Sequence, residues 1–299
     1  MTGSTGFIGR SMTAYLAAAG VEVVRISAIA SGPGVAHVPF ADVDAVAGVL
    51  GQLAPSHVLH FSGVLQTAGS AALITANAGN AAVLLDAAAL AAPEARLVLM
   101  GSAAEYGSVP AGRGKVDELQ PCAPTTPYGA AKLAQTRLAL ASSRPVVVVR
   151  PTNVIGPGMP RALALGRFSA ELGTAPRRDE PGPVHVLSVG DLSAIRDMID
   201  VRDAVRLIWA LATNDEAVGQ IVNVGTGAGA SIGDALDLMV RAFDRRVEVR
   251  ASGSGSERSH GASAFVADID KLEGLLGPQR FIPLADSIER IASETEGAG

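Results

Sequence analysis

MTGSTGFIG (residues 1–9) opens the chain and places glycines at positions 3, 6 and 9. Glycines at this spacing let the backbone turn tightly and approach a phosphate group closely. Residues 8–20 have the apolar periodicity of a helix, whose first amide groups and positive dipole end would face that phosphate. The segment therefore predicts a phosphate-binding turn. Considered alone, a glycine-rich disordered start fits these residues equally well.

The composition is that of a folded globular protein. The chain has 299 residues, of which 48% are apolar and 18% are charged. Its net charge of −5 gives no general attraction to nucleic acids or anionic membranes, so neither is expected as a partner. Cys122 is the only cysteine, which excludes an intrachain disulfide and predicts an incidental loop thiol. We find no signal peptide and no apolar run long enough to span a bilayer, and we expect a cytoplasmic protein without a metal site.

The pattern along the chain predicts an α/β fold. Short β-branched runs alternate with longer amphipathic stretches rich in alanine and leucine, as in a parallel sheet covered on both faces. We therefore expect a Rossmann-like, doubly wound parallel sheet with right-handed connections. The predicted strands are 21–26, 37–40, 57–63, 96–102, 145–151 and 220–227, and the predicted helices are 8–20, 44–53, 73–92, 126–143, 200–213 and 230–243.

The regular alternation ends after Arg150, which predicts a second structural unit. Residues 152–199 are rich in glycine, proline and arginine, and residues 252–263 have the composition of a flexible loop. We expect residues 1–151 with about 200–227 to form the large sheet domain. Residues 152–199 with 228–299 would form a smaller C-terminal lobe.

A glycine turn in such a sheet is typical of dinucleotide binding, and the next strand bears on the choice of dinucleotide. This fold often ends that strand with a carboxylate on the adenosine ribose, but here it ends with Arg25, Ile26 and Ser27. Without an acid, nothing repels a 2′-phosphate, and Arg10 or Arg25 can attract one. The sequence thus favours NADP(H) over NAD(H), although both arginines also fit as solvated surface charges. Asp42 can approach the adenine or cap a helix.

Three polar residues converge where such a fold binds its ligands. Tyr128 and Lys132 are four residues apart and share one helical face, with Thr126 as the expected cap and Pro127 as the first helical residue. Ser102 ends the preceding strand, at the carboxyl edge of the sheet. The three side chains are therefore expected to meet beside a nicotinamide.

The chemistry of these residues indicates proton transfer coupled to hydride transfer. A tyrosine with a pKa of about 10 is a poor base at neutral pH, and a nearby ammonium favours its phenolate. Lys132 can supply that charge and hold the nicotinamide ribose, while Tyr128 exchanges a proton with a carbonyl–alcohol pair. Ser102 would donate to the same oxygen. A half-buried tyrosine and a surface lysine are the alternative, which the strand and helix context disfavours.

Motifs cover essentially the whole chain: TGSTGFIG (2–9), GSAAEYG (101–107), PYGAAK (127–132), RPTNVIGPG (150–158), IRDMIDVRDAV (195–205) and IVNVGTG (221–227). Together they resemble the extended short-chain dehydrogenase/reductases of the nucleotide-sugar epimerase, dehydratase and reductase group. The resemblance implies a cofactor domain, a C-terminal lobe that grips a nucleoside-diphosphate sugar, and a homodimer of paired helices.

The resemblance also implies site residues. Those expected at the cofactor are Gly3, Thr5, Gly6, Phe7, Ile8, Gly9, Arg10, Asp42, Val43, Asn77, Tyr128 and Lys132. Those expected at the substrate are Ser102, Tyr128, Asn153, Arg196 and Arg258. Asn77 would support the cofactor pocket or pack beneath it, and His60 is expected to be structural rather than catalytic.

The substrate residues have structural alternatives. Asn153 also fits as a loop-capping amide. Arg196 can form an internal ion pair with Asp200 or Asp203 instead of facing a phosphate. Arg258 lies in a loop without the proline that usually follows such an arginine in this group.

The residues after Ser102 narrow the set of reactions that the resemblance allows. Dehydratases of this group carry an acidic pair there, but here the positions hold Ala103 and Ala104, which cannot transfer protons. Glu105 comes one position late and would project differently. The stretches 156–161 and 187–205 most resemble reductases that act on GDP-4-keto-6-deoxymannose.

The resemblance therefore implies a reductase in which NADPH gives hydride to the keto carbon, Tyr128 protonates the oxygen, and a GDP-6-deoxyhexose is formed. A nucleotide-sugar 4-epimerase with the same residues is the first alternative. A non-catalytic nucleotide-binding relative is the second, and the intact serine, tyrosine and lysine disfavour it.

The position of the glycine turn raises a question about the start of the chain. In this fold a central strand precedes the turn, yet Gly3 is the third residue. Loss of that strand would leave unpaired backbone groups and an apolar slot in the sheet. We therefore expect the biological chain to start about six to eight residues earlier, the usual length of a strand. If Met1 is the true start, weak cofactor binding and low stability are expected.

Overall fold

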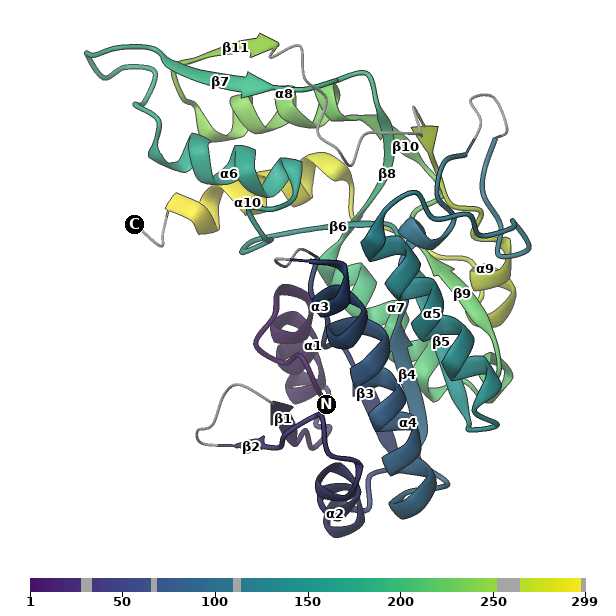
Figure 1. Ribbon diagram of the computed structural model, residues 1–299. Helices are drawn as coiled ribbons and strands as arrows, with labels where there is room; N and C mark the ends of the chain where they lie inside the picture. The colour runs from purple at the N-terminus through teal and green to yellow at the C-terminus, as the bar shows by residue number, and fades with distance from the viewer. Residues whose placement is uncertain (28–33, 66–68, 110–113, 252–263, 297–299) are drawn as a thin grey trace.

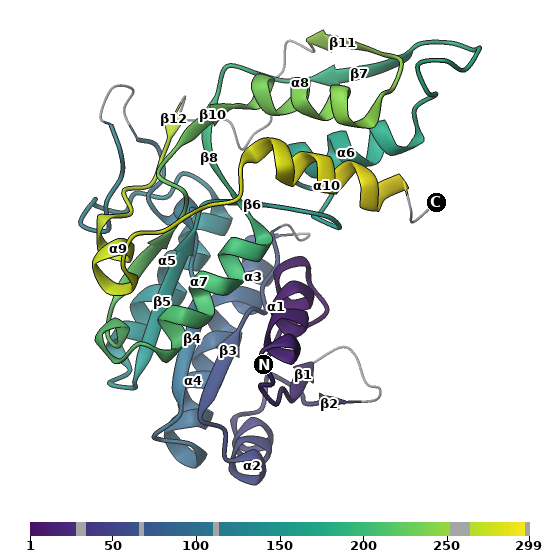
Figure 2. The same cartoon turned by 180° about the vertical axis from the view of Figure 1, so that it is seen from behind.

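The computed structural model describes residues 1–27, 34–65, 69–109, 114–251 and 264–296. A parallel sheet lies at its centre, in the order β3 (His57–His60), β4 (Arg96–Met100), β5 (Val146–Pro151) and β9 (Ile221–Val224). Helices cover both faces of this sheet, and a smaller group of elements lies at its upper end (Figures 1 and 2). The fold is therefore the predicted α/β class.

The two faces of the sheet follow from the alternation of side chains along each strand. In β4, Leu97 and Leu99 pack in one core with helices α2 and α4, whereas Val98 and Met100 pack in another with α1 and α7. All four side chains are at most 7% exposed, which explains the continuous apolar sequence of these strands. The covering helices are α1 (Phe7–Ala18), α2 (Val43–Leu53), α3 (Ser70–Ile74), the π-helical turn Thr75–Gly79, α4 (Asn80–Ala91), α5 (Pro127–Ala141) and α7 (Val201–Thr213).

The first two residues lie between the central sheet and a small parallel pair, β1 (Arg25–Ser27) and β2 (Val35–His37). Thr2 forms a parallel bridge to Ile26 on one side and to His60 on the other. Its N–H donates to Leu59 O at 2.9 Å, and the Ile26 N–H donates to Met1 O at 2.8 Å. This part of the chain thus takes the central position expected of a first strand, and the expectation of an earlier start stays a prediction.

The expectation that no apolar segment is long enough to span a bilayer was wrong. The continuous helical segment Ser70–Ala91 has 22 residues and is long and apolar enough to cross a membrane by length and composition. In the structure this segment is partly buried, and α4 packs against α2 and α5 beside the sheet. Core helices of sheet proteins have this same character, so the segment is explained by packing within the fold.

The upper group of elements was mostly missed by sequence reasoning. Its core lies between α6, α8 and α10, under the parallel pair β7–β11, while β8 pairs with β6, β10 and β12. In contrast, α9 packs on β9 and α7 of the sheet region. The bounds are β6 (Asn153–Ile155), α6 (Ala164–Thr174), β7 (His185–Val189), β8 (Ile195–Asp200), β10 (Gly229–Ser231), α8 (Ile232–Phe243), β11 (Val247–Ala251), β12 (Ala264–Phe265), α9 (Asp270–Leu276) and α10 (Leu284–Glu296), with 3-10 turns at Ala103–Glu105 and Asp215–Ala217.

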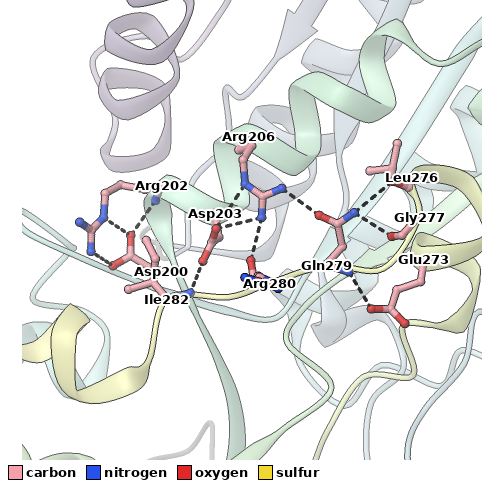
Figure 3. A network of polar contacts seen from close by, with 10 residues as sticks. All are labelled: Asp200, Arg202, Asp203, Arg206, Glu273, Leu276, Gly277, Gln279, Arg280 and Ile282. Atoms are coloured by element: carbon pink, nitrogen blue, oxygen red, sulfur yellow. Dashed lines mark hydrogen bonds and ion pairs between the residues drawn. The ribbon is translucent and has the colours of Figure 1, made fainter.

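A polar network fastens the segment between α9 and α10 to the start of α7 (Figure 3). Asp203 accepts from the Ile282 N–H at 2.7 Å and from Arg206 Nη2 at 3.0 Å. Arg206 also donates to Gln279 Oε1 at 2.8 Å. Asp203 is only 5% exposed, so its hydrogen bonds replace water that it lost on folding.

The substitution Asp203→Ala tests this attachment. It leaves the Ile282 N–H without its acceptor and Arg206 without its carboxylate, so we expect the free energy of unfolding to fall by about 2–3 kcal/mol. Urea denaturation of the purified protein measures this. Asp237→Ala removes an exposed carboxylate from α8 and should change stability by no more than about 0.5 kcal/mol. Equal losses in the two variants would contradict the assigned role.

Candidate active site

The glycine turn closes tightly against the end of β3. Gly3 has a φ of +68°, and a Cβ there would lie 2.4 Å from the carbonyl carbon of Phe61. A Cβ on Gly9 would lie 2.0 Å from Gly3 O, whereas one on Gly6 would meet only that oxygen, at 3.3 Å. Gly3 and Gly9 are therefore required by packing, and Gly6 is on the open side of the turn.

The remaining residues of the turn connect it to its surroundings. Thr5 is exposed, while Phe7 packs against both the sheet core and the core of the upper lobe. Ile8 packs on the sheet core alone. Arg10 donates to Thr5 O at 2.8 Å and to Gly158 O at 3.3 Å. Arg10 thus joins the turn to the loop after β6.

The adenosine side of the expected cofactor site is only partly described. Asp42 is the N-cap of α2 and accepts from the Ala45 N–H at 3.1 Å, and Val43 is the first residue of that helix. The helix-capping alternative for Asp42 is therefore confirmed. Arg25 begins β1 and donates to Gly34 O at 3.2 Å, and the residues between Ser27 and Gly34 lie outside the described ranges. The preference for NADP(H) stays a prediction.

Ser102 and Tyr128 are carried by two segments in direct contact. Ser102 follows β4 and caps the turn Ala103–Glu105, with its Oγ accepting from the Ala104 N–H at 3.1 Å. Tyr128 is half-buried in the first turn of α5, which begins at the predicted cap Thr126. A Cβ on Gly129 would lie 2.4 Å from Ala104 O, so the start of α5 packs directly on the turn after Ser102.

Lys132 lies one helical turn beyond Tyr128 and is only 4% exposed. Its Nζ donates to Met100 O at 2.9 Å and to Gln135 Oε1 at 3.1 Å, while Gln135 Nε2 donates to the same carbonyl at 2.8 Å. Burial lowers the pKa of Lys132 to about 8, and the Glu105 carboxylate opposes this change. Lys132 therefore keeps its charge at neutral pH and loses it as the pH rises through about 8.

Asn77 and Gly63 complete this part of the site. Asn77 lies fully buried in the π-helical turn, where its Nδ2 donates to Val64 O and Leu73 O and its Oδ1 has no partner. A Cβ on Gly63 would lie 2.5 Å from that Oδ1 and 3.2 Å from Lys132 Nζ. Sequence reasoning missed Gly63; its signal is a glycine at the carboxyl end of a buried strand.

His60 is a structural residue, as expected. Its ring is fully buried, and its Nδ1 shares a hydrogen bond of 2.9 Å with Thr2 Oγ1. Burial lowers the pKa of His60 to about 3, and the charge of Lys132 adds to the effect. The imidazole is therefore neutral at neutral pH and supports the position of Thr2 between β1 and β3.

The candidate substrate residues lie on β6 and β8. Asn153 is exposed, and its Nδ2 donates to Asp197 O at 3.0 Å. Arg196 is partly buried and donates to Ile195 O at 2.8 Å. Arg258 lies outside the described residues.

The internal ion pair considered for Arg196 was wrong. Asp200 pairs with Arg202 at 2.7 Å, and Asp203 pairs with Arg206 at 3.0 Å. Both carboxylates therefore pair with arginines of α7, not with Arg196 on β8.

Comparison with known proteins identifies the chain's relatives. A model described as "NAD dependent epimerase/dehydratase family" matches residues 1–225. The chain belongs to this family. It is an NAD(P)-dependent enzyme of the extended short-chain dehydrogenase/reductase type, in the group that acts on nucleotide sugars by dehydration, reduction or epimerisation.

Individual relatives of this family cover most of the chain. The dTDP-6-deoxy-L-talose 4-dehydrogenase (NAD(P)(+)) of Kitasatospora kifunensis is 33% identical over 80% of this chain and 76% of its own. The GDP-6-deoxy-D-mannose reductase of Pseudomonas aeruginosa is 25% identical over 99% of this chain and 96% of its own. The structure of RMD from Pseudomonas aeruginosa complexed with NADPH has a TM-score of 0.83 and 23% identity, over 99% of this chain and 98% of that one. The last comparison supports the fold.

The described residues fit the family's dinucleotide. Helix α1 begins without a side-chain cap and has no acid in its first turn, so its first amides suit a diphosphate. Gly6 leaves the approach open, and the unpartnered Asn77 Oδ1 marks a polar position near Lys132 Nζ. The glycine turn, the buried ammonium of Lys132 and the unpartnered amide oxygen of Asn77 are together compatible with a bound dinucleotide.

The substitution Gly9→Ala tests whether the glycine turn (residues 3–9), called the cradle below, binds the phosphates of the cofactor. Because its Cβ would lie 2.0 Å from Gly3 O, the turn must open, and we expect NADPH to bind at least about tenfold more weakly. Fluorescence titration measures this. Gly48→Ala is the matched control, since nothing lies within 4 Å of its Cβ in α2; it should bind normally and gain up to about 1 kcal/mol of stability. Unchanged binding by Gly9→Ala would rule out the cradle.

The neutral His60 makes stability depend on pH. Its pKa is about 3 in the folded chain against about 6.5 unfolded, so the unfolded state takes up a proton first as the pH falls below about 6.5. We expect its contribution to lower the free energy of unfolding by roughly 2 kcal/mol between about pH 7 and pH 5. Urea denaturation at both pH values should show a smaller decrease in His60→Gln than in the exposed control His37→Gln. The same decrease in both would refute this assignment.

Proposed function

We propose that the protein is an NADPH-dependent reductase of a nucleoside-diphosphate-linked 4-keto-6-deoxy sugar, with a GDP-6-deoxyhexose as product. The observation that carries the proposal is the contact between the Ser102 turn and the first turn of α5, beside the buried ammonium of Lys132. Ala103 and Ala104 follow the serine, so neither position offers an acid for dehydration. The reductase relative from Pseudomonas aeruginosa, alignable over nearly both whole chains, supports this choice.

In this proposal NADPH, when bound, supplies the hydride. Tyr128 gives its proton to the carbonyl oxygen of the sugar, and Ser102 donates a hydrogen bond to that oxygen. Lys132 keeps an ammonium near the phenolate that Tyr128 leaves, and it has a third N–H for the cofactor ribose beyond its bonds to Met100 and Gln135. Ser102 thus acts from the end of β4, and Tyr128 and Lys132 act from the first two turns of α5.

The proposal also divides the chain. Residues 1–151 with about 200–227 would hold the dinucleotide, with Arg10 or Arg25 favouring its 2′-phosphate. Residues 152–199 with 228–299 would hold the sugar nucleotide. The residues assigned to its phosphates and sugar are Asn153, Arg196 and Arg258, and the arginines suit bidentate contacts. A homodimer of paired helices and a cytoplasmic location remain predictions.

Consumption of NADPH against a panel of nucleotide-linked 4-keto sugars tests the activity. We expect oxidation of NADPH with a GDP-linked 4-keto-6-deoxyhexose, and weaker or no oxidation of NADH. Turnover without net consumption of cofactor would establish the 4-epimerase alternative and overturn the reductase. Failure to bind either dinucleotide by fluorescence would overturn the enzyme assignment altogether.

The role of Tyr128 gives a separate prediction. Tyr128→Phe removes the proton donor but keeps the ring, so kcat should fall by about 100-fold or more while the Kd for NADPH stays within about twofold. Tyr15→Phe on α1 removes a hydroxyl outside the candidate site and should leave kcat unchanged. Equal activity of Tyr128→Phe and the wild type would exclude this proton donor.

A further inference from the structure

A buried ion pair lies directly behind the candidate site and has no part in the chemistry proposed above. Glu105 Oε2 is 2.8 Å from Arg150 Nη2 and accepts from Arg150 Nε at 2.9 Å. Glu105 is fully buried and Arg150 is 2% exposed. Replacing water around two charges is unfavourable unless the geometry and the additional hydrogen bonds are good. The contacts of Glu105 show what this pair holds in place.

The Glu105 carboxylate links three elements of the site. Its Oε1 accepts from the Ser102 N–H at 2.9 Å and from Thr136 Oγ1 on α5 at 3.0 Å. Its Oε2 is held by Arg150 on β5. A Cβ on Gly101 would lie 2.6 Å from Oε1, so a glycine at the end of β4 makes room for the carboxylate.

Arg150 is itself fixed on the far side. Its guanidinium lies 4.6 Å from the centre of the Tyr106 ring, and its Nη2 donates to Cys122 Sγ at 3.3 Å. The Tyr106 hydroxyl donates to Asn223 Oδ1 on β9 at 2.7 Å. These contacts keep the Glu105 carboxylate pointed into the core, where it cannot reach a substrate.

Thr136 lies one turn beyond Lys132 on α5, so the bond from Glu105 to Thr136 acts on the helix that carries the lysine. Resting on the proposed function, we propose that Glu105 is a positioning residue that locks the Ser102 turn and α5 into one register, and so fixes Ser102 relative to Tyr128 and Lys132. On the buried face of α5, Thr136 makes this attachment, while Lys132 and Gln135 donate to Met100 O on β4.

Electrostatics gives the lock a second effect. Burial lowers the pKa of Lys132, and the Glu105 carboxylate raises it, so part of the lysine's charge at neutral pH depends on Glu105. The other ionisable groups around them include the neutral His60 on β3, which the lysine charge affects, and Arg150 behind Glu105. They also include the Cys122 thiol, whose pKa is raised by burial and by the Glu105 charge, and Tyr128, one turn before Lys132 on α5. Burial raises the pKa of Glu105, and the Arg150 guanidinium opposes that change in favour of the carboxylate.

Three variants of the full chain separate the hydrogen bonds from the charge. Thr136→Val removes one bond of the lock and no charge. Glu105→Asp keeps the charge on a side chain one methylene shorter. The double variant Glu105→Gln/Arg150→Met removes both charges, so neither ion is left unpaired. Asp237→Asn, an exposed carboxylate of α8, is the control.

The main measurement needs no substrate: acetylation of Lys132 by acetic anhydride, quantified by mass spectrometry against pH. We expect the midpoint of the acetylation profile to move to lower pH in the double variant and to stay in place in Glu105→Asp, Thr136→Val and the control. An unmoved midpoint in a folded double variant would overturn the electrostatic effect.

Kinetics then test the positional effect. With a substrate turned over by the wild type, Thr136→Val should lower kcat about fivefold with little change in KM, as expected for the loss of one hydrogen bond. Wild-type kcat in both Thr136→Val and Glu105→Asp would overturn the lock. If no sugar is reduced, the proposed function fails, while the acetylation profile still tests the link between Glu105 and Lys132. If the double variant does not fold, Glu105→Asp and Thr136→Val still test the lock by kinetics.

Discussion

The buried ammonium of Lys132 is the constraint around which the site is arranged. A lysine that is 4% exposed has lost most of its water, and an isolated charge in such a place would deprotonate. Here Met100 O and Gln135 Oε1 accept from it, and the Glu105 carboxylate adds a favourable field. These groups must themselves be held in place. Met100 is held in β4, and Glu105 is held by the Ser102 N–H and by Arg150, so the charge of the lysine depends on all three.

A second constraint acts at the other end of the site, where the sheet and the glycine turn share the first residues of the chain. The β1–β2 pair joins the central sheet through the backbone of Met1 and Thr2. The Thr2 side chain is tied to a neutral, buried His60. One residue later Gly3 begins the turn, so any displacement of Thr2 also moves the cradle.

The sequence predicted what local pattern determines. The strands predicted over 57–63, 96–102 and 145–151 are observed at His57–His60, Arg96–Met100 and Val146–Pro151. The helix of Tyr128 and Lys132 with its Thr126 cap was also predicted, as was a sheet covered by helices on both faces, because runs and spacings within a few residues determine them. The strand predicted over 21–26 shrank to Arg25–Ser27, because only those residues find a partner in β2.

What the sequence could not predict depends on partners far along the chain. Strand β8 is completed by β12, about seventy residues later, and the elements of 152–199 are short and interrupted by glycine and proline. The pairing of Glu105 with Arg150 joins positions 45 residues apart, so no local pattern reveals it. Arg196 was likewise considered as a partner for Asp200 or Asp203 because they are close in sequence, yet Arg202 and Arg206 are closer in space.

The two hydrogen bonds of Arg10 have a thermodynamic consequence. One guanidinium bonds the Thr5 carbonyl in the glycine turn and the Gly158 carbonyl in the loop between β6 and α6. A ligand that shifts the glycine turn or the loop therefore also changes the free energy of ligand binding at the other segment. Such coupling is reciprocal, because the order in which two ligands bind cannot change the total free energy of the complex. If a ligand at the glycine turn changes the affinity of a second ligand at the loop by some factor, the second ligand changes the affinity of the first by that same factor.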